Sequence, residues 1–505
     1  MKGDKSFAIS LAALLAVGRV FGGAADEGAD AIRRGIESRV AAAAGECARL
    51  QQGLTNRVLL TDYAADVVRT NGCEVWTAAL QRALDEHEVV VVPARPERYC
   101  IDAPVIVPSN RRIEAAGATV ALLPGTETIL LRNAGARDGT LAPLDRTRRD
   151  DNIAICGGRW EDCNARRRGY GASGRCNNRP RERGNFFGVS TLFYFGCANH
   201  VTVRDATFAQ CAAFAVQVGD FDAIVLERIR FDSCFADGLH LNGNLSRALV
   251  RDVKGDVGDD LVALNAYDWI NSSVNFGPQR DILCEDLELR LRDGKGYPAI
   301  RIQPAVYRHA DGSEVDCAVS DVIFRKVRGI LTFKMYLQTP VYVIGEKPEW
   351  GRVGSGGNLF LEDVAIDLDR PLDGFREYVE SDPVRGHFAA FEIGANLSGV
   401  HFRNLAVKFH ADRFPLSHLV TVGPKSVVLD GRDGRRREVF DPYVSCSVGE
   451  VSLDGCEFGG ALPEELVHAT SFADVNRDGR SSGAGRIGSV RQRRETGLRE
   501  SEGVE

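Results

Sequence analysis

The sequence predicts an all-β protein, a single-stranded parallel β-helix capped at its start by a helix. Three observations predict this fold: a short repeat along most of the chain, an alternation of apolar and polar residues within each copy, and a helix followed by strands ahead of the first copy. Asn-Gly and similar hairpin turns are scarce, which disfavours the alternative of a β-sandwich or barrel with irregular loops.

The repeat reads apolar-x-apolar, then a charged or polar pair, then apolar-x-apolar, as in VTVRDATF at 201–208. Its copies begin at Ile153, Val201, Ile224, Ala248, Ile282, Val322, Leu359, Val400 and Val451. The second, third and fourth copies are 23 and 24 residues apart, and later intervals lengthen to between 34 and 51. A period of two is typical of a strand with one buried face, and a unit this short cannot enclose a core alone. Stacked as coils of a parallel solenoid, the units bury a continuous core, and the longer intervals become loop insertions.

The segment ahead of the repeat predicts the cap. Residues 76–84 carry apolar side chains at helical spacing, and the run VVVVP at 89–93 follows as a strand. Residues 113–123 contain two further strand-like pieces around Gly117. A helix followed by a first strand covers the open end of a solenoid, where backbone groups would otherwise form a free edge.

The period of 23 to 24 residues favours one elongated domain, although the length alone would suggest two or three. The 505 residues include 53 glycines, which fit turns between coils, and 63 basic against 70 acidic residues give a net charge of −7. This charge gives no reason to expect a nucleic-acid partner. The longest apolar run, at about residues 7–17, is shorter than the ~20 residues of a membrane span. We therefore expect no membrane span, and we expect a monomer.

We expect four segments along the chain. Residues 1–25 have a basic start, an apolar stretch and a small-residue end, which predict a signal peptide and a secreted or periplasmic protein; an ordinary amphipathic helix is the alternative. Residues 26–60 follow as a helical segment and residues 61–460 as the β-helix catalytic domain. The polar residues 461–505 are expected to be a disordered tail.

The 13 cysteines fit an oxidising compartment. No C-x2-C pair occurs, so a zinc ribbon or finger is not expected, and we predict neither a metal nor a cofactor. The odd number leaves at least one thiol unpaired. Cys156, Cys163 and Cys176 fall in one loop-rich stretch and are candidates to pair with each other.

Two carboxylate motifs carry the candidate chemistry. Asp237 lies in FADGLHLNG at 235–243, and Asp259 and Asp260 lie in GDDLVALN at 258–265. Asp237 and Asp260 each come just before a strand and are 23 residues apart, one coil, so they are expected to stack as neighbours ~4.8 Å apart. Carboxylates this close raise the pKa of at least one of them, which supplies a proton donor beside ionised bases. The alternatives are turn residues or a Ca²⁺ site.

Further residues are candidates to bind a substrate. His240 alternates with Leu239 and Leu241, and Arg301 alternates with two isoleucines, so both are predicted to face outward beside the carboxylates. Tyr267 and Trp269 are candidates to stack on a sugar, with core or loop packing as the alternative. The arginine-rich stretch at 166–183 is either a site for an acidic polysaccharide or a solvated insertion.

The start of the chain resembles the pectin-lyase-like right-handed parallel β-helix superfamily, through AALQRAL at 78–84, VVP at 91–93, YCID at 99–102 and PSNRRI at 108–113. The two carboxylate motifs resemble the polygalacturonases, glycoside hydrolase family 28. The resemblance implies that Asp259 is the general acid and that Asp237 and Asp260 activate water in an inverting hydrolysis. The Gly-His-Gly motif of that family is missing here. Its Arg-Ile-Lys motif has the counterpart Arg301-Ile-Gln303, so that Gln303 stands where a lysine would contact the substrate.

The leading hypothesis is a glycoside hydrolase that cleaves a pectin-like or other acidic polysaccharide or oligosaccharide. A polysaccharide lyase or epimerase of the same fold is the second hypothesis, in which the carboxylates would hold Ca²⁺ and Arg301 or another base would take a proton. A non-catalytic glycan-binding β-helix is the third.

Overall fold

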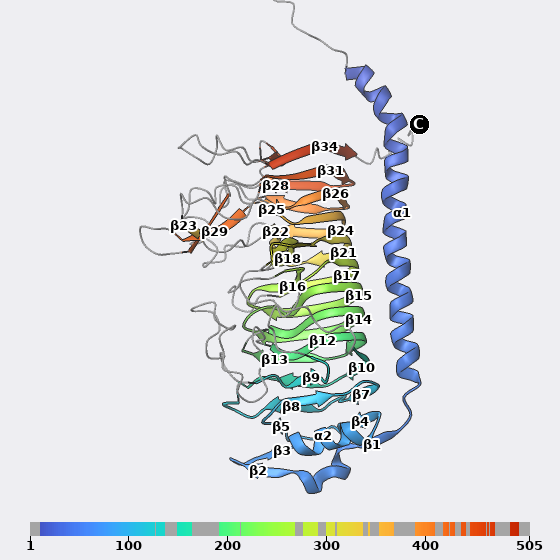
Figure 1. The fold of residues 1–505 in the computed structure, drawn as a ribbon. Coiled ribbons are helices and arrows are strands. Elements are labelled where there is room, and N and C mark those ends of the chain that lie inside the picture. Colours follow the sequence, from blue (N-terminus) through green and yellow to red (C-terminus); the bar gives the residue numbers. More distant parts are fainter. Residues whose placement is uncertain are drawn as a thin grey trace, which may run out of the picture.

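The computed structural model is a parallel β-helix with a long N-terminal helix lying along its side (Figure 1). The structure describes residues 11–126, 128–136, 149–163, 191–212, 214–267, 276–290, 299–308, 311–336, 342–343, 353–367, 389–409, 418–423, 425–429, 436–440, 445–460, 462–463, 465–469 and 485–493. Within these ranges, only the backbone is described for 11–27, 308, 336, 342–343, 425–429 and 436–440.

The elements follow in chain order. The N-terminal region contains α1 (Leu11–Gln52), β1 (Arg57–Leu59), the 3₁₀ helix η1 (Leu60–Asp66), β2 (Val68–Thr70), β3 (Cys73–Val75), α2 (Thr77–Glu86), β4 (Val89–Val91), β5 (Tyr99–Ile101), β6 (Val105–Val107), β7 (Arg111–Glu114), β8 (Thr119–Leu122) and β9 (Leu131–Asn133). The middle coils contain β10 (Asp150–Cys156), β11 (Arg159–Glu161), β12 (Thr191–Arg204), β13 (Thr207–Cys211), β14 (Phe214–Cys234), β15 (Leu239–Val257), β16 (Asp260–Asn265), β17 (Gln279–Leu289) and β18 (Ala299–Gln303). The remaining strands are β19 (Ala305–Arg308), β20 (Glu314–Cys317), β21 (Val319–Arg328), β22 (Thr332–Tyr336), β23 (Tyr342–Val343), β24 (Ser355–Asp367), β25 (Ala389–Gly394), β26 (Asn396–Arg403), β27 (Ala406–Phe409), β28 (His418–Val422), β29 (Lys425–Leu429), β30 (Arg436–Phe440), β31 (Cys446–Asp454), β32 (Glu457–Gly460), β33 (Val467–Ala469) and β34 (Gly485–Arg493).

The sequence repeat aligns in register from coil to coil, which confirms the predicted solenoid. The first residues of all nine copies pair in one continuous column, from Ile153 to Val201, Ile224, Ala248, Ile282, Val322, Leu359, Val400 and Val451. Every one of these pairings is parallel. All nine side chains are buried in a core that runs the length of the stack.

The polar pair inside each copy has a backbone role. Its second residue adopts the left-handed conformation in every copy: Gly157, Asp205, Arg228, Asp252, Asp286, Lys326, Asp363, Asn404 and Gly455 have φ between 52° and 77°. This conformation turns the chain sharply between two strand segments of a coil. Gly, Asn and Asp tolerate it best, which explains why they fill seven of the nine positions.

Helix α2 covers the first coil, as predicted. Its apolar face, formed by Ala79, Leu80, Ala83 and Leu84, is buried in the same core as the strands. Strand β4 follows it, and β7 and β8 lie on either side of Gly117, where φ is 74°. The predicted helix and strands ahead of the repeat are therefore confirmed.

Helix α1 packs against an apolar column on the outside of the β-helix. The column is formed by residues that pair one with the next across neighbouring strands: Val225, Leu249, Leu283, Ile323 and Phe360. Residues of α1 bury this column: Ile36, Val40, Ala43 and Cys47. The helix thus runs from the C-terminal coils back to the first one (Figure 1).

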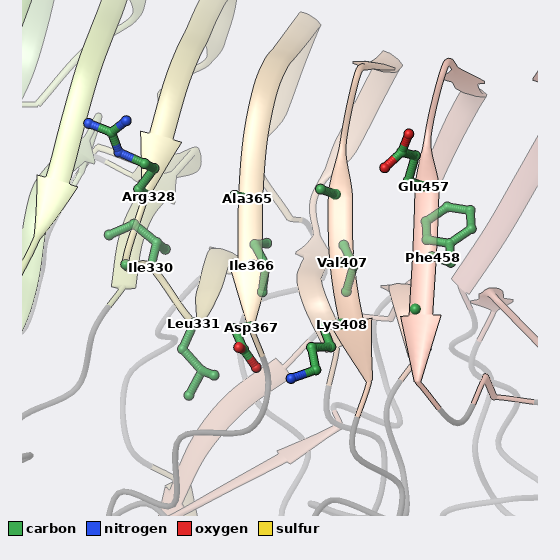
Figure 2. Close-up of a pocket in the computed structure, with 13 residues that line it drawn as sticks. Arg328, Ile330, Leu331, Ala365, Ile366, Asp367, Val407, Lys408, Glu457 and Phe458 are labelled. Atoms are coloured by element: carbon green, nitrogen blue, oxygen red, sulfur yellow. The ribbon is translucent and has the colours of Figure 1, made fainter. Parts of the chain in front are cut away.

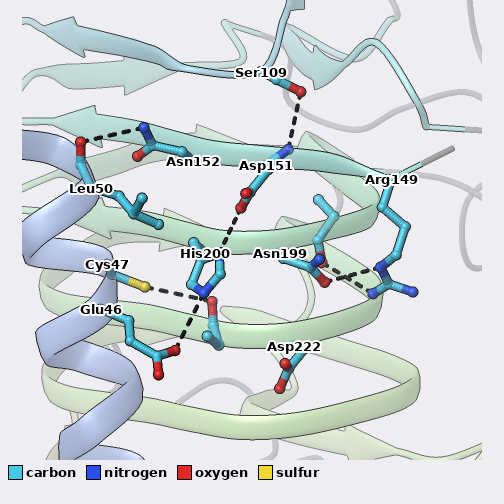
Figure 3. A network of polar contacts seen from close by, with 12 residues as sticks. Glu46, Cys47, Leu50, Ser109, Arg149, Asp151, Asn152, Asn199, His200 and Asp222 are labelled. Atoms are coloured by element: carbon cyan, nitrogen blue, oxygen red, sulfur yellow. Dashed lines mark hydrogen bonds and ion pairs between the residues drawn. The ribbon is translucent and has the colours of Figure 1, made fainter. Parts of the chain in front are cut away.

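Ion pairs and hydrogen bonds flank this apolar contact. Arg39 Nη2 lies 2.7 Å from Asp281 Oδ1, and Arg247 Nη1 lies 3.0 Å from Glu46 Oε2. Figure 3 shows His200 between the helix and the coils, with Nδ1 2.6 Å from Asp151 Oδ1 and Nε2 3.4 Å from Glu46 Oε2. The helix is therefore an integral part of the outer surface.

The segment boundaries differ from those expected. The helix expected within 26–60 ends at Gln52, and it begins inside the expected leader, where residues 11–25 are already helical. Residues 1–10 lie outside the described residues. No helix in the described part of the chain is both long and apolar enough to cross a membrane.

The expectation of a disordered tail over 461–505 is wrong for two strands. Strand β33 pairs with β28, and β34 pairs with β31 through eight residues, from Gly485 opposite Cys446 to Arg493 opposite Asp454. The 485–493 segment is poor in apolar residues, but an open strand edge binds through backbone hydrogen bonds, for which side-chain hydropathy is irrelevant. The last described coil is completed in this way.

Candidate active site

Asp237 and Asp260 occupy equivalent places in neighbouring coils. Leu239 of β15 pairs with Val262 of β16, and the Gly238 amide donates a 3.0 Å hydrogen bond to the Asp260 carbonyl. One carboxylate oxygen from each of Asp237, Asp259 and Asp260 lies within 4.8 Å of the others. The structure therefore brings together the three acids that the sequence analysis singled out.

Two glycines allow this close approach. A side chain on Gly238 would meet the Phe231 ring at 2.6 Å and the Leu261 carbonyl oxygen at 2.9 Å. A side chain on Gly258, immediately before Asp259, would meet the Phe235 carbonyl oxygen at 2.2 Å. Both contacts are below the distance that a Cβ atom tolerates, so these turns need glycine to hold the acids side by side.

Two cations come from the next coils. Arg301 pairs with Ala263 on one side and with Lys334 on the other, in the same column as His240. Arg301 Nε lies 3.1 Å from Asp260 Oδ2, and Lys334 Nζ lies 2.8 Å from Asp260 Oδ1. Lys334 Nζ is also 3.3 Å from Asp259 Oδ1. Asp260 is held between both cations.

Asp237 has a separate partner. His240 Nδ1 lies 2.5 Å from Asp237 Oδ2, and the His240 ring stacks on Phe214 with ring centroids 4.0 Å apart and planes 8° apart. The second Asp237 oxygen accepts a 3.2 Å hydrogen bond from the Asp260 amide. The His240 side chain thus lies beside the carboxylates, as predicted. It is nevertheless buried, because the Phe214 ring stacks on it.

The two adjacent acids differ in their pKa values. Burial raises the pKa of the Asp260 carboxyl to about 7, and the charges of Asp259 and Asp237 add to the rise. At Asp259 burial acts in the same direction, but Lys334 and Arg301 outweigh it and lower the pKa below 3.8. Three carboxylates share two cations here, so the most buried acid keeps the proton.

Exposure also distinguishes these acids. The Asp259 side chain is 44% exposed, whereas those of Asp237 and Asp260 are 5% and 1% exposed. Among the three, Asp259 is the one that a bound molecule reaches directly. The cluster thus combines an accessible acid whose pKa is lowered with a buried acid whose pKa is raised.

The remaining sequence candidates lie elsewhere. Gln303 is completely buried, and its Nε2 donates a 2.8 Å hydrogen bond to the Tyr267 carbonyl, away from the acids. Tyr267 packs in the core, with its ring edge-on to Tyr307 at 5.3 Å, so the expectation of a sugar-stacking ring there is wrong. The ring is buried because Ala266 and Tyr267 continue the core side of the coil. Trp269, the arginine-rich stretch and Cys176 lie outside the described residues.

Sequence reasoning missed Lys334 and Phe214. Lys334 lies in TFKMY at 332–336, where it alternates with Phe333 and Met335 and therefore faces outward, like Arg301 one coil earlier. The separation of 33 residues between Arg301 and Lys334 hides this relation, because the coil carries an inserted hairpin of β19 and β20. Periodicity alone does not measure such an insertion.

The acid cluster does not fit the Ca²⁺ of the lyase hypothesis. The oxygens that a divalent cation would need are already close to Lys334 and Arg301. The positive charges of the buried Lys334 and the partly buried Arg301 repel a third cation at this position. The donor set therefore suits proton transfer or an anionic ligand better than a metal.

A separate hollow of ≈ 490 Å³ lies over β24, β27 and β32, away from the acids (Figure 2). Its lining includes Ala365, Val407, Lys408 and Phe458. None of the three clustered acids lines it.

Comparisons with known proteins support no family assignment. No protein-family model and no curated protein matches the sequence. Among solved structures, the chain is similar to an exopolygalacturonase from Thermotoga maritima at 12% identity, with a TM-score of 0.40, over 89% of this chain and 96% of that one. It is also similar to a tailspike mutant of Escherichia coli bacteriophage HK620 in complex with a pentasaccharide, at 13% identity and a TM-score of 0.42, over 86% and 78%. The Streptococcus pneumoniae surface adhesin PfbA is similar at 12% identity and a TM-score of 0.36, over 80% and 84%. These proteins differ in function, so the class that the structure defines is the parallel β-helix.

Proposed function

We propose that this protein is a glycoside hydrolase that cleaves an acidic polysaccharide or oligosaccharide by carboxylate acid/base catalysis. The observation that carries the proposal is the group of three acids within 4.8 Å, of which one is exposed and one has a pKa raised to about 7. Hydrolysis of a glycosidic bond needs an acid for the leaving oxygen and a base for water, and this cluster offers both.

Asp259 is assigned the delivery of the proton to the leaving oxygen, because it is the exposed acid of the cluster. Below about pH 7 Asp260 holds the proton in the resting protein, since its pKa is about 7. A substrate carboxylate bound beside the exposed Asp259 would raise the pKa of Asp259 by charge repulsion more than that of the buried Asp260, which keeps its contacts with Lys334 and Arg301. The proton would then favour Asp259, and Asp260 with Asp237 would activate the water.

An acidic substrate follows from the two cations beside the acids. Arg301 and Lys334 lie on the outward side of their strands, next to the proposed reaction centre. Guanidinium and ammonium groups recognise carboxylates by charge and hydrogen bonding. A uronate-containing glycan supplies such a carboxylate, and an exported enzyme, as predicted from residues 1–25, would meet it outside the cytoplasm.

The test is the Asp259→Asn variant on a panel of neutral and acidic polysaccharides, read by release of reducing ends and by binding. Asn keeps the size of the side chain and removes the proton donor, so we expect hydrolysis to fall by about 10²–10⁴-fold with binding retained. Asp363→Asn is the matched control, because Asp363 is exposed on a corner far along the chain, where Asn is equally tolerated. Wild-type hydrolysis in Asp259→Asn would contradict the proposal.

Two other outcomes distinguish the competing functions. Binding of a glycan by the wild-type protein without release of any reducing end would favour a glycan-binding protein. Unsaturated products that absorb in the ultraviolet would favour a lyase.

A further inference from the structure

We propose that His418, Glu465 and His468 form a binding site for a zinc ion on the last coils of the β-helix. One ligand atom from each of these three side chains lies within 4.8 Å of the other two. Imidazole nitrogens together with a carboxylate oxygen are a donor set that suits Zn²⁺, whereas Ca²⁺ and Mg²⁺ prefer oxygen ligands alone. The site is invisible in the sequence, because 47 residues separate His418 from Glu465.

Two neighbouring strands hold the three residues together. His418 is the first residue of β28, and β33, which carries His468, pairs with β28 in parallel. The amides of Leu419 and Val420 both donate hydrogen bonds to the Leu466 carbonyl, at 2.8 and 3.0 Å. The backbone beside the ligands is therefore in place before any metal binds.

His418 is oriented by a hydrogen bond to the backbone. Its Nδ1 lies 2.7 Å from the Glu465 carbonyl oxygen. A carbonyl oxygen can only accept, so Nδ1 carries the proton and Nε2 of the neutral ring carries the lone pair. Histidine ligands of metals commonly donate their second ring nitrogen to a carbonyl or carboxylate in this way. Nε2 is therefore the His418 atom that we assign to the metal.

Glu465 and His468 supply the other two ligand atoms. His468 Nδ1 lies 2.8 Å from Glu465 Oε2, and the rings of His418 and His468 have centroids 4.7 Å apart and planes 15° apart. Two ligands of a tetrahedral Zn²⁺ lie roughly 3.4 Å apart, given metal bonds of ~2.1 Å, so a small opening of the contact between Glu465 and His468 would admit the ion. Zn²⁺ would take the place of the proton between these two atoms, and the neutral His468 ring would then carry its proton on Nε2. Water would fill the fourth position.

The charge and exposure of Glu465 favour a cation. Its side chain is 57% exposed, so an ion from the solvent reaches the carboxylate directly. Among the described residues, no lysine or arginine forms an ion pair with Glu465. The acid cluster differs in this respect, because Lys334 and Arg301 already neutralise its carboxylates.

The zinc site lies further along the same column of side chains as the acid cluster. Lys334 pairs with Glu392, Glu392 with Thr421, and Thr421 with His468. At ~4.8 Å per coil, these three pairings place His468 roughly 14 Å beyond Lys334 along the stack. An ion held there would not touch the acids, so it would take no part in the proposed hydrolysis.

A bound ion would fasten one of the last strands to the coil before it. Strand β33 has only three residues, and the ion would join it to β28 through side chains as well as through the backbone. A metal that binds the folded chain and not the unfolded one stabilises the fold by mass action. The zinc-bound protein is therefore the more stable form.

The test uses the full-length protein without a histidine tag, stripped of metal and titrated with Zn²⁺ by isothermal titration calorimetry. We expect a melting temperature higher by about 3 °C at a Zn²⁺ concentration of about 100 times Kd, and no shift with Ca²⁺. His418→Ala and His468→Ala should each weaken Zn²⁺ binding by at least about 100-fold. Glu465→Gln, which keeps the size of an exposed side chain and therefore the fold, should weaken it by about 10-fold.

His87→Ala is the matched control. His87 follows α2 in the N-terminal cap, where its Nδ1 contacts Asn56, so this variant should bind Zn²⁺ as the wild type does. Co²⁺ serves as a spectroscopic probe, and its weak visible bands should appear without the intense absorption that thiolate ligands cause. Wild-type affinity for Zn²⁺ in Glu465→Gln and His418→Ala, or thiolate absorption with the first equivalent of Co²⁺, would overturn the proposal.

Discussion

The Lys334 ammonium lies 2.8 Å from the Asp260 carboxylate, and the two side chains are 3% and 1% exposed. Neither side chain is part of the core, because both point to the outward side of their coils. Burying a charged pair is costly unless both members stay paired. The burial of this pair is therefore an energetic cost that the packing of the core does not require.

Lys334→Ala should impair both stability and hydrolysis. Loss of the buried cation leaves Asp260 without its closest partner, so the free energy of unfolding should fall by about 3 kcal/mol, as measured by urea denaturation. Hydrolysis should fall on the order of 10²-fold, because the charge beside the reacting group is lost. Lys408→Ala, at an exposed lysine on another face, should change neither quantity.

A double variant separates the two effects of Lys334. Asp260→Asn combined with Lys334→Met removes both charges, so much of the stability lost in Lys334→Ala should return. Hydrolysis should not return with it. If the double variant hydrolyses glycans at the wild-type rate, the ion pair has no part in the reaction.

The pH dependence of stability should report the raised pKa of Asp260. A carboxyl whose pKa rises on folding contributes stability that is fully present below about pH 4 and is lost as the pH rises through about 7. The difference between wild type and Asp260→Asn in urea midpoint should therefore change in this window. An unchanged difference from pH 4 to pH 8 would show that Asp260 is ionised throughout.

Hydrolysis should be insensitive to chelators. Lys334 and Arg301 occupy the positions next to the Asp260 oxygens that a divalent cation would need. We expect equal rates with EDTA and with added Ca²⁺, measured as release of reducing ends. Activity that EDTA abolishes and Ca²⁺ restores would instead support the lyase or another metal-dependent reaction.

Helix α1 should be required for a monodisperse protein. Ala43→Asp places a charge in the contact between α1 and the outer apolar column, where Ala43 is 2% exposed. We expect a loss of about 3 kcal/mol in stability and aggregation by size-exclusion chromatography, because an unpaired charge is buried or the column is uncovered. Ala42→Asp, one residue earlier on the exposed side of the helix, is the matched control and should behave as wild type.

Much of the site was accessible from the sequence because its spacing equals one coil. Asp237 and Asp260 are 23 residues apart, the interval of the regular repeat, so their stacking followed from the period. Lys334 escaped because an inserted hairpin separates it from Arg301. Tyr267 was expected to contact a sugar but packs in the core. A side chain just past the end of a strand can point into the core or out of it, and the direction depends on the path of the chain that follows.

The sequence by itself determined the solenoid, its cap and the grouping of three acids. These features follow from local rules: a period of two for the strands, left-handed corners that favour Gly, Asn and Asp, and equal intervals that stack equivalent residues. The tertiary structure alone decided which cations meet the acids, which acid keeps the proton, and where α1 lies. Those outcomes depend on distances between coils and on burial, which are set by contacts across hundreds of residues, and Asp30 of α1 meeting Arg403 at 3.0 Å is one of them.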